Sequence, residues 1–290
     1  MAGLEIGRRF DGRPLVLPWP RCQHILIGGE TGGGKSGVVN AILWVLAAMP
    51  GVAICGIDLK LVELWPWRDR LTSLASTPEE ADRLLVQLRN LIRQRMLIMR
   101  SLGVKRWPID IGPWVVVLVD ELAELHALDA DTLAAAVDGD SRARKDAIAD
   151  GKSGQQVRVG LLGALARLSR ACGVTIVTAT QYPSAEVIDQ QIRTQMTIRI
   201  MMRVASAEQV NVILGRGYAQ RVAVRDIPPT ERGGLYLLGT PDALLPVRGR
   251  AHWTSDHAIG TRVAETRQLA IPPDQLFVPP ADPVDQTAEP

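Results

Sequence analysis

Eight residues near the N-terminus have the types and spacing of a phosphate-binding loop. Residues 29–36 match the pattern G-x-x-x-x-G-K-[ST], and apolar segments precede and follow them. Glycines let main-chain N–H groups close around phosphate oxygens, and a helix that follows points its positive dipole end at the same anion. The lysine reaches the β- and γ-phosphates, and the serine hydroxyl binds Mg²⁺. The predicted nucleotide-binding residues are Gly29, Glu30, Thr31, Gly32, Gly33, Gly34, Lys35 and Ser36. The alternative is a glycine-rich turn between a strand and a helix.

An acidic pair follows the apolar segment WVVVLV at residues 114–119. Ligands of open α/β sheets bind at the carboxyl ends of the strands, where Asp120 and Glu121 would lie. We therefore predict that Asp120 and Ser36 hold Mg²⁺ and that Glu121 polarises the water that attacks the γ-phosphate. An acidic pair after a strand can also cap a helix, but the phosphate loop upstream favours the metal site.

A polar pair ends another apolar segment, in the stretch TATQYP. Thr180 and Gln181 fall where a polar side chain would sense the γ-phosphate or orient the water. The alternative is a polar strand end before a proline turn.

Apolar segments of strand length alternate with helical patterns along most of the chain. The segments lie at residues 22–28, 51–58, 114–121, 173–181, 196–204 and 233–239. Helices are predicted over residues 37–49 and from Thr77-Pro78-Glu79-Glu80, a capping-box start, to about Leu102. This pattern predicts an α/β fold with a mostly parallel sheet covered by helices on both faces. Residues 126–157 lack an apolar stripe and are predicted to form a surface insertion; residues from Ile271 onward are proline-rich and acidic and are predicted to be disordered.

The composition is typical of a soluble protein in a reducing compartment. Of 290 residues 47% are hydrophobic, and the formal net charge is +2, made from 28 Arg and 5 Lys against 31 acidic residues. Three cysteines (Cys22, Cys55 and Cys172) lie far apart near apolar segments, which suits buried free thiols. The longest apolar run, residues 41–49, is too short to span a membrane. We expect a cytoplasmic protein that reaches a membrane only through a partner protein.

Taken together, the motifs resemble the motor domain of the FtsK/SpoIIIE family of hexameric DNA translocases. The matching stretches, in family order, are the lead-in and loop IGRRFDGRPLVLPWPRCQHILIGGETGGGKS, then IDLKLVEL, RMLIMRSLGV, VVVLVDELAEL, TATQYPSAEVI and QMTIRIMMRVASAEQVNVILG. The resemblance implies a RecA-like P-loop ATPase core that uses ATP and Mg²⁺ and assembles as a homo-oligomeric ring, a hexamer, around double-stranded DNA. It assigns catalytic roles to Lys35, Glu121 and Gln181. It also implies an arginine finger acting in trans, for which Arg199 is the first candidate and Arg203 and Arg216 are neighbours.

The resemblance also suggests an organisation and a task. Residues 1–23 would lead into the motor, residues 24–250 would form it, and residues 251–290 would be a C-terminal extension. Leu59 replaces the usual proline of the family, which leaves the roles of Asp58 and Lys60 open. Without a membrane anchor or winged-helix domain, the layout is similar to plasmid and integrative-element transfer proteins of actinobacteria. The alternatives are a type VII-like secretion ATPase, a septal chromosome-segregation motor and a nucleotide-gated scaffold that does not hydrolyse ATP. Basic residues around Lys152 and Arg158 could contact DNA phosphates, although a solvated loop is the preferred interpretation.

Overall fold

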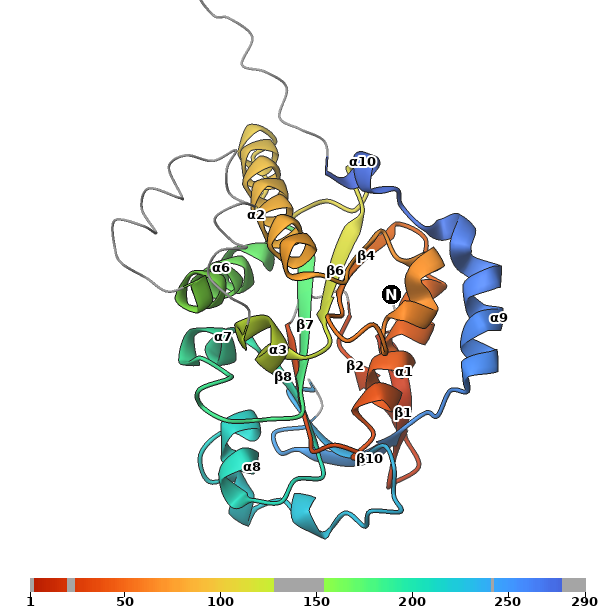
Figure 1. Cartoon of the computed structure of the whole chain (residues 1–290), viewed down its shortest axis with the longest axis vertical. Coiled ribbons are helices and arrows are strands. Elements are labelled where there is room, and N and C mark those ends of the chain that lie inside the picture. Colours follow the sequence, from red (N-terminus) through yellow and green to blue (C-terminus); the bar gives the residue numbers. More distant parts are fainter. Residues whose placement is uncertain (1–2, 20–23, 128–153, 241–242, 278–290) are drawn as a thin grey trace, which may run out of the picture.

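One mixed sheet runs through the chain, of which the computed structural model describes residues 3–19, 24–127, 154–240 and 243–277 (Figure 1). The strands lie in the order β2-β1-β10-β9-β8-β3-β7-β6-β4-β5. Their bounds are β1 Leu4–Arg9, β2 Pro14–Leu17, β3 Ile25–Gly28, β4 Val52–Ile57, β5 Ser73–Ala75, β6 Trp114–Val119, β7 Val174–Thr180, β8 Ile198–Met202, β9 Gly234–Leu238 and β10 Val247–Ala251.

The sheet has a parallel part and an antiparallel part that meet at β8. Strands β8, β3, β7, β6, β4 and β5 pair in parallel, whereas β9, β10, β1 and β2 continue the sheet as antiparallel neighbours. The predicted α/β fold with a mostly parallel sheet is therefore confirmed. The sequence patterns did not indicate β1, β2, β5 or β10. Strands β1 and β2, in the expected lead-in, belong to this sheet, and the expected boundary at residue 250 lies inside β10; the division into three parts stays a prediction.

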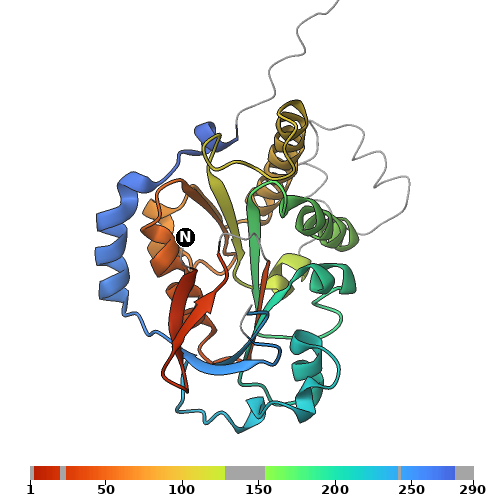
Figure 2. The ribbon, with the colours of Figure 1, turned by 180° about the vertical axis from the view of Figure 1, so that it is seen from behind.

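Helices cover both faces of the sheet, as expected (Figures 1 and 2). On one face α1 and α9 pack against the strands, and on the other lie α2, α3, α6, α7 and α8. Strand β6 contributes Val115 and Val117 to the core of one face and Val116 and Leu118 to the other, so its continuous apolar run is buried on both sides. The helices are α1 Lys35–Ala47, α2 Pro78–Ser101, α3 Leu122–Ala127, α6 Gly154–Ser169, α7 Gln190–Gln195, α8 Ala207–Leu214, α9 Asp256–Thr266 and α10 Pro273–Leu276, with 3-10 turns η1 Trp65–Arg70, η2 Tyr218–Gln220, η3 Val224–Asp226 and η4 Arg267–Leu269.

Helix α2 begins and ends where its sequence predicts. The Thr77 hydroxyl accepts the Glu80 N–H, and the Glu80 carboxylate accepts the Thr77 N–H, which completes a capping box with Pro78 in the first turn. Gly103 follows the helix with φ 67°, a conformation that favours glycine.

Two sequence expectations require correction. Most of the predicted insertion lies outside the described residues, but Arg158 does not form part of a DNA-binding loop: it lies on α6, is fully buried, and donates to both Asp82 carboxylate oxygens at 2.7 and 2.8 Å. Residues 271–277, expected to begin a disordered tail, include α10, and Leu276 packs into the core. The rest of the tail, residues 278–290, lies outside the described residues.

The structure describes two of the three cysteines that the sequence predicts to be buried free thiols. Cys55 and Cys172 are buried free thiols, and burial raises the pKa of Cys55 to about 12. Cys22 lies outside the described residues. Of the helices that the structure describes, none is long and apolar enough to cross a membrane.

Candidate nucleotide-binding site

The phosphate loop joins the end of β3 to the start of α1. Gly32 and Gly34 have φ of 79° and 99°, which places their main chain in a conformation that L residues with side chains rarely adopt. A Cβ at Gly34 would also lie 2.4 Å from the Gly233 nitrogen. Glycine is therefore required at this position, and the loop N–H groups can face an anion at the N-terminus of α1.

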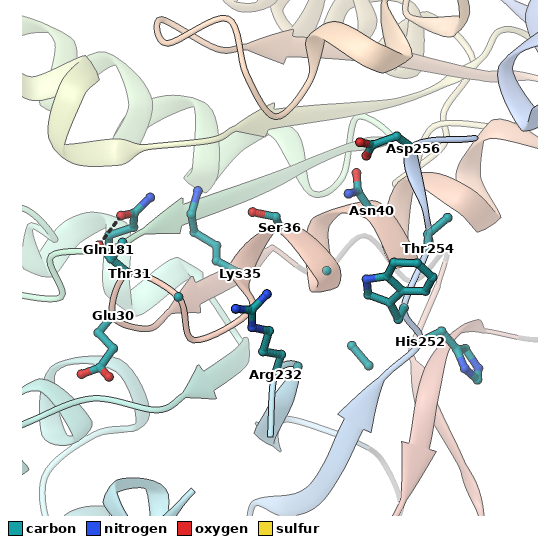
Figure 3. A pocket seen from close by; sticks show the side chains of 16 residues that line it. Glu30, Thr31, Lys35, Ser36, Asn40, Gln181, Arg232, His252, Thr254 and Asp256 are labelled. Atoms are coloured by element: carbon teal, nitrogen blue, oxygen red, sulfur yellow. Dashed lines mark hydrogen bonds between the residues drawn. The ribbon is translucent and has the colours of Figure 1, made fainter. Parts of the chain in front are cut away.

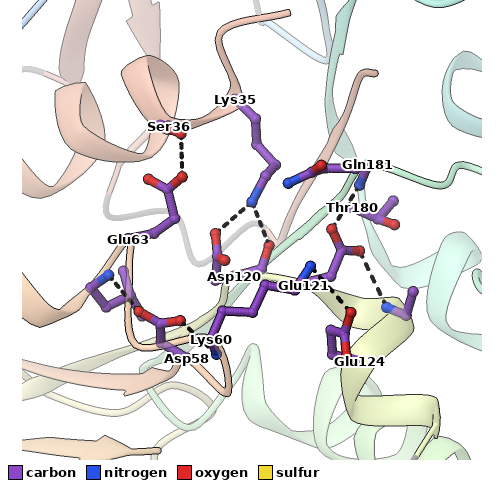
Figure 4. A network of polar contacts seen from close by, with 12 residues as sticks. Lys35, Ser36, Asp58, Lys60, Glu63, Asp120, Glu121, Glu124, Thr180 and Gln181 are labelled. Carbon is purple, nitrogen blue, oxygen red and sulfur yellow. Dashed lines mark hydrogen bonds and ion pairs between the residues drawn. The ribbon is translucent and has the colours of Figure 1, made fainter. Parts of the chain in front are cut away.

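Lys35 and Asp120 form a buried ion pair at the centre of the site (Figure 4). The Lys35 Nζ lies 2.5 Å from Asp120 Oδ1 and 2.9 Å from the Asp120 carbonyl oxygen, and each residue is only 4% exposed. Burial raises the pKa of the Asp120 carboxyl, and the nearby carboxylates of Glu63 and Asp58 add to this effect against the opposing influence of Lys35. Lys35 is thus the local countercharge of an acidic cluster.

Glu63 is a member of this cluster to which the sequence analysis assigned no role, although it lies in the family-like stretch IDLKLVEL. Its carboxylate accepts a hydrogen bond from the Ser36 hydroxyl. The loop from β4 presents it there, because the buried Asp58 carboxylate accepts the Lys60 and Leu64 N–H groups at 3.2 and 2.8 Å. Asp58 therefore shapes the loop, and the Lys60 Nζ pairs with Glu124 at 3.1 Å.

Glu121 is connected to the phosphate loop through Gln181. Glu121 Oε2 accepts the Gln181 N–H at 3.0 Å, and the Thr31 hydroxyl donates to Gln181 Oε1 at 2.7 Å. Since β3, β7 and β6 are adjacent parallel strands, their carboxyl ends bring these three residues together. The predicted residues come together at the carboxyl ends of these central strands, which we call the nucleotide edge: Lys35, Ser36, Asp120, Glu121 and Gln181.

A cavity of ≈ 420 Å³ lies beside this edge, within the size range of small-ligand sites. Figure 3 shows the side chains around it. Its lining combines the phosphate loop with residues that the sequence patterns did not indicate: Asn40, Arg232, Gly233, Ala251, His252, Trp253, Thr254 and Asp256. No local motif marks the latter group, because only the fold places the end of β10 against the loop.

The donor set fits a nucleotide with Mg²⁺. Ser36 and Asp120 supply a hydroxyl and a carboxylate oxygen, which are the ligands that Mg²⁺ prefers. Lys35 and the loop N–H groups supply the donors that phosphate oxygens require. In the structure Lys35 is bonded to Asp120 and the Ser36 hydroxyl to Glu63. A phosphate oxygen could replace the carboxylate beside Lys35, and Mg²⁺ could bind the Ser36 oxygen.

Arg199, the first candidate for the arginine finger, is bonded within its own chain. Its guanidinium donates to four main-chain carbonyl oxygens, those of Arg193, Met196, Ile213 and Leu214, at 2.9–3.2 Å. A side chain held in this way connects β8 to α7 and α8, and its role as an arginine finger stays a prediction. Arg203 pairs with Glu30 of the phosphate loop. Arg216 is exposed and has no ion pair within the described residues.

A model of the FtsK/SpoIIIE family matches residues 2–238, which include every residue of the site described above except those beyond β9. The chain belongs to the FtsK/SpoIIIE family. The expected resemblance is confirmed, and with it the P-loop ATPase fold. Among curated relatives, the DNA translocase FtsK of Halalkalibacterium halodurans is 28% identical over 280 residues, which cover 89% of this chain and 31% of that protein. The chain spans about a third of the length of the curated relatives it matches.

Solved structures support the FtsK/SpoIIIE fold. The pCW3 conjugation coupling protein TcpA, in its monomer form with ATPγS, superposes with a TM-score of 0.72 at 24% identity and covers 92% of this chain and 71% of its own. The cytoplasmic domain of the type VII secretion ATPase EccC of Thermomonospora curvata has a TM-score of 0.65 at 21% identity, covering 96% of this chain and 32% of its own. Both similarities concern the fold.

Proposed function

We propose that this FtsK/SpoIIIE chain hydrolyses ATP and uses the energy to move double-stranded DNA. The observation on which the proposal rests is the convergence of Lys35, Ser36, Asp120 and Glu121 at the carboxyl ends of adjacent strands. Family membership and the DNA translocases among the relatives support DNA as the substrate.

The proposed chemistry follows from the residues of the site. Lys35 and the loop N–H groups bind the β- and γ-phosphates, and Ser36 and Asp120 hold Mg²⁺. Mg²⁺, when bound, neutralises charge on the phosphate oxygens. Glu121 accepts a proton from the attacking water, and the Gln181 N–H holds the Glu121 carboxylate in place at 3.0 Å. The Thr31 to Gln181 hydrogen bond couples the phosphate loop to this base.

We further propose that the motor acts as a hexameric ring in conjugative transfer and that a partner protein holds it at a membrane. The fold similarity to the conjugation coupling protein TcpA supports the transfer role. The fold similarity to EccC accompanies the alternative of a polypeptide substrate, which the experiment below separates.

The test is ATP hydrolysis by the purified chain with double-stranded DNA, single-stranded DNA or neither, together with its mass in solution. Displacement of a third strand from a triplex provides a direct readout of movement along the duplex. The matched control is Lys35→Ala, which should lose both activities.

The expected result is hydrolysis stimulated by duplex DNA of any sequence, a ring-sized species, and triplex displacement that requires ATP. Hydrolysis that is indifferent to DNA, with no displacement, would contradict translocation of DNA and favour a polypeptide substrate. Hydrolysis that survives Lys35→Ala would contradict the assignment of the ATPase site itself.

A further inference from the structure

We infer that the segment after β10, residues 252–254, is the wall on which the nucleoside part of the nucleotide binds, with the Trp253 indole as the platform for the base. The inference rests on the proposed binding of ATP at the phosphate loop and specifies the part of that site that no motif marks. The ligand class is a nucleoside di- or triphosphate.

The position of Trp253 in the site supports this role. Its residue is 82% exposed although indole is among the most apolar side chains, and it lines the cavity of ≈ 420 Å³ that also contains Lys35 and Ser36. A second hollow of ≈ 400 Å³ lies on the same segment and is lined by Trp253 and Trp44. An exposed aromatic ring that borders a phosphate-binding cavity is suited to stack on a base.

The wall is tied to the phosphate loop by main-chain hydrogen bonds. The Gly233 N–H donates to the Gly33 carbonyl at 3.4 Å, and the Ala251 N–H donates to the Gly233 carbonyl at 2.9 Å. The next residue, His252, donates its N–H to the Ile6 carbonyl at 2.9 Å. The backbone from which Trp253 projects is therefore fixed relative to the loop, so a phosphate bound at the loop and a base on the indole would be held in register.

The direction of the nucleotide follows from the two ends of the site. Glu121 and Gln181 lie at the γ-phosphate end, and the Thr31 to Gln181 hydrogen bond closes that side. In Figure 3, Thr31 and Gln181 lie on one side of Lys35, whereas Asn40, Thr254 and Asp256 lie on the other. A nucleotide with its γ-phosphate near Gln181 must extend its nucleoside toward the second group.

Polar groups at that second end match a nucleoside. Asn40 Oδ1 accepts the Trp67 indole N–H at 2.9 Å, which fixes the side chain and directs its amide NH₂ away from Trp67. Asp256 lines the cavity as well, and Figure 3 places it at the same end as Asn40. An amide donor and an anionic acceptor at this end of the cavity can bind the hydroxyls of a ribose or the polar edge of a base.

The experiment measures binding of ATP, ADP and inorganic tripolyphosphate to the full chain and to Trp253→Ala, Trp253→Phe and Lys35→Ala. Trp253→Ala should raise the Kd for ATP and ADP about tenfold while leaving the Kd for tripolyphosphate unchanged, because only the nucleosides lose a stacking partner. Trp253→Phe keeps an aromatic face and should stay within about threefold of the parent chain. Lys35→Ala should raise the Kd for all three ligands.

Several outcomes would overturn the inference. An unchanged Kd for ATP in Trp253→Ala, with Lys35→Ala impaired, would remove the base platform but keep the phosphate site. Equal loss of ATP and tripolyphosphate binding in Trp253→Ala would show that the indole supports the loop structurally. A change in solution mass with unchanged ATP affinity would assign Trp253 to a contact between subunits. If Lys35→Ala bound ATP normally, the proposed function itself would fail.

Discussion

Two groups of buried charges in this chain are equally hidden from solvent but differ in what surrounds them. At the nucleotide edge, Lys35, Asp120 and Glu121 are 4–5% exposed and their partners are other charged or polar groups beside a cavity. In the body of the fold, Arg158 and Arg70 are 0% exposed. Arg158 is paired with Asp82, and Arg70 donates to the main-chain carbonyls of residues 47, 49 and 52.

The difference concerns which partners a ligand can replace. A charge bonded to main-chain carbonyls or to one fully buried carboxylate has partners that cannot leave without unfolding, so its removal costs stability. A lysine bonded to a carboxylate beside a cavity can exchange that partner for a phosphate oxygen. Burial of a charged residue therefore does not by itself mark a functional site; a replaceable partner next to a cavity does.

The largest effect is expected at Glu121. Glu121→Gln keeps the hydrogen bond from the Gln181 N–H but removes the proton acceptor, so ATP turnover should fall about 10²–10⁴-fold while ATP still binds. Steady-state hydrolysis and equilibrium ATP binding would measure the two properties separately.

The matched control is Glu124→Gln, on α3, the helix that directly follows Glu121; its side chain is 44% exposed and pairs with Lys60. An exposed pair of this kind contributes little, so turnover should remain near that of the parent chain. Equal losses in the two variants, or full turnover in Glu121→Gln, would contradict the assignment of Glu121 as the base.

The next effect concerns the structural group. Arg158→Met removes the buried cation that pairs with both Asp82 carboxylate oxygens, so the free energy of unfolding should fall by about 3–5 kcal/mol. The double variant Asp82→Leu/Arg158→Met removes both charges and should recover most of that loss. Denaturant unfolding of the three chains measures this, and a double variant no more stable than the single one would show that the pair has a role beyond mutual neutralisation.

The sequence could predict the nucleotide edge because its information is local. The phosphate loop is a contiguous motif, and Asp120, Glu121 and Gln181 each follow an apolar run, so parallel pairing alone brings them together. The parallel strands other than the short β5, and the antiparallel strand β9, were predictable for the same reason. The antiparallel strands β1, β2 and β10 were not: β1 is LEIGRR and β10 is VRGRA, in which arginines and glycines obscure any strand pattern.

The remaining misses depend on partners distant in the sequence. Arg158 lies 76 residues from Asp82, and nothing around either residue distinguishes a buried pair from a solvated loop. Trp253 and Arg232 reach the cavity because the β9–β10 pair lies against the phosphate loop, a contact that no motif encodes. Similarly, Glu63 contacts Ser36 because Asp58 shapes the intervening loop.

A smaller effect is expected at His24, a buried group away from the cavity. Its Nδ1 accepts the Ile176 N–H at 3.0 Å and its Nε2 lies 2.8 Å from the Ala166 carbonyl. Burial lowers the pKa of His24 from 6.5 to about 4, and the positive charge of Arg170 acts in the same direction. Between these two values the unfolded chain binds a proton that the folded chain does not, so stability present above pH 6.5 is lost as the pH falls toward 4.

The expected loss attributable to His24 is about 3 kcal/mol across that pH range. His24→Gln offers a donor and an acceptor but does not titrate, so the free energy of unfolding of the variant should depend less on pH. As the pH rises from 4 to 6.5, the parent chain should therefore gain stability relative to the variant. Parallel pH profiles for the two chains would mean that other groups cause the acid sensitivity.

The smallest effect is expected at Arg199, for which the family resemblance predicts an arginine finger and the contacts indicate a structural role. The Arg199 guanidinium is partly buried, which lowers its pKa, and it donates to four carbonyl oxygens. Because Arg199→Ala removes these hydrogen bonds, the free energy of unfolding should fall by about 2 kcal/mol. Arg216→Ala, at an exposed position, should lose almost none. If Arg199 belongs to the structural group, the folded variant turns over ATP at the parent rate per subunit. A variant of parent stability that binds ATP but does not turn it over would instead support the predicted role of Arg199 as an arginine finger.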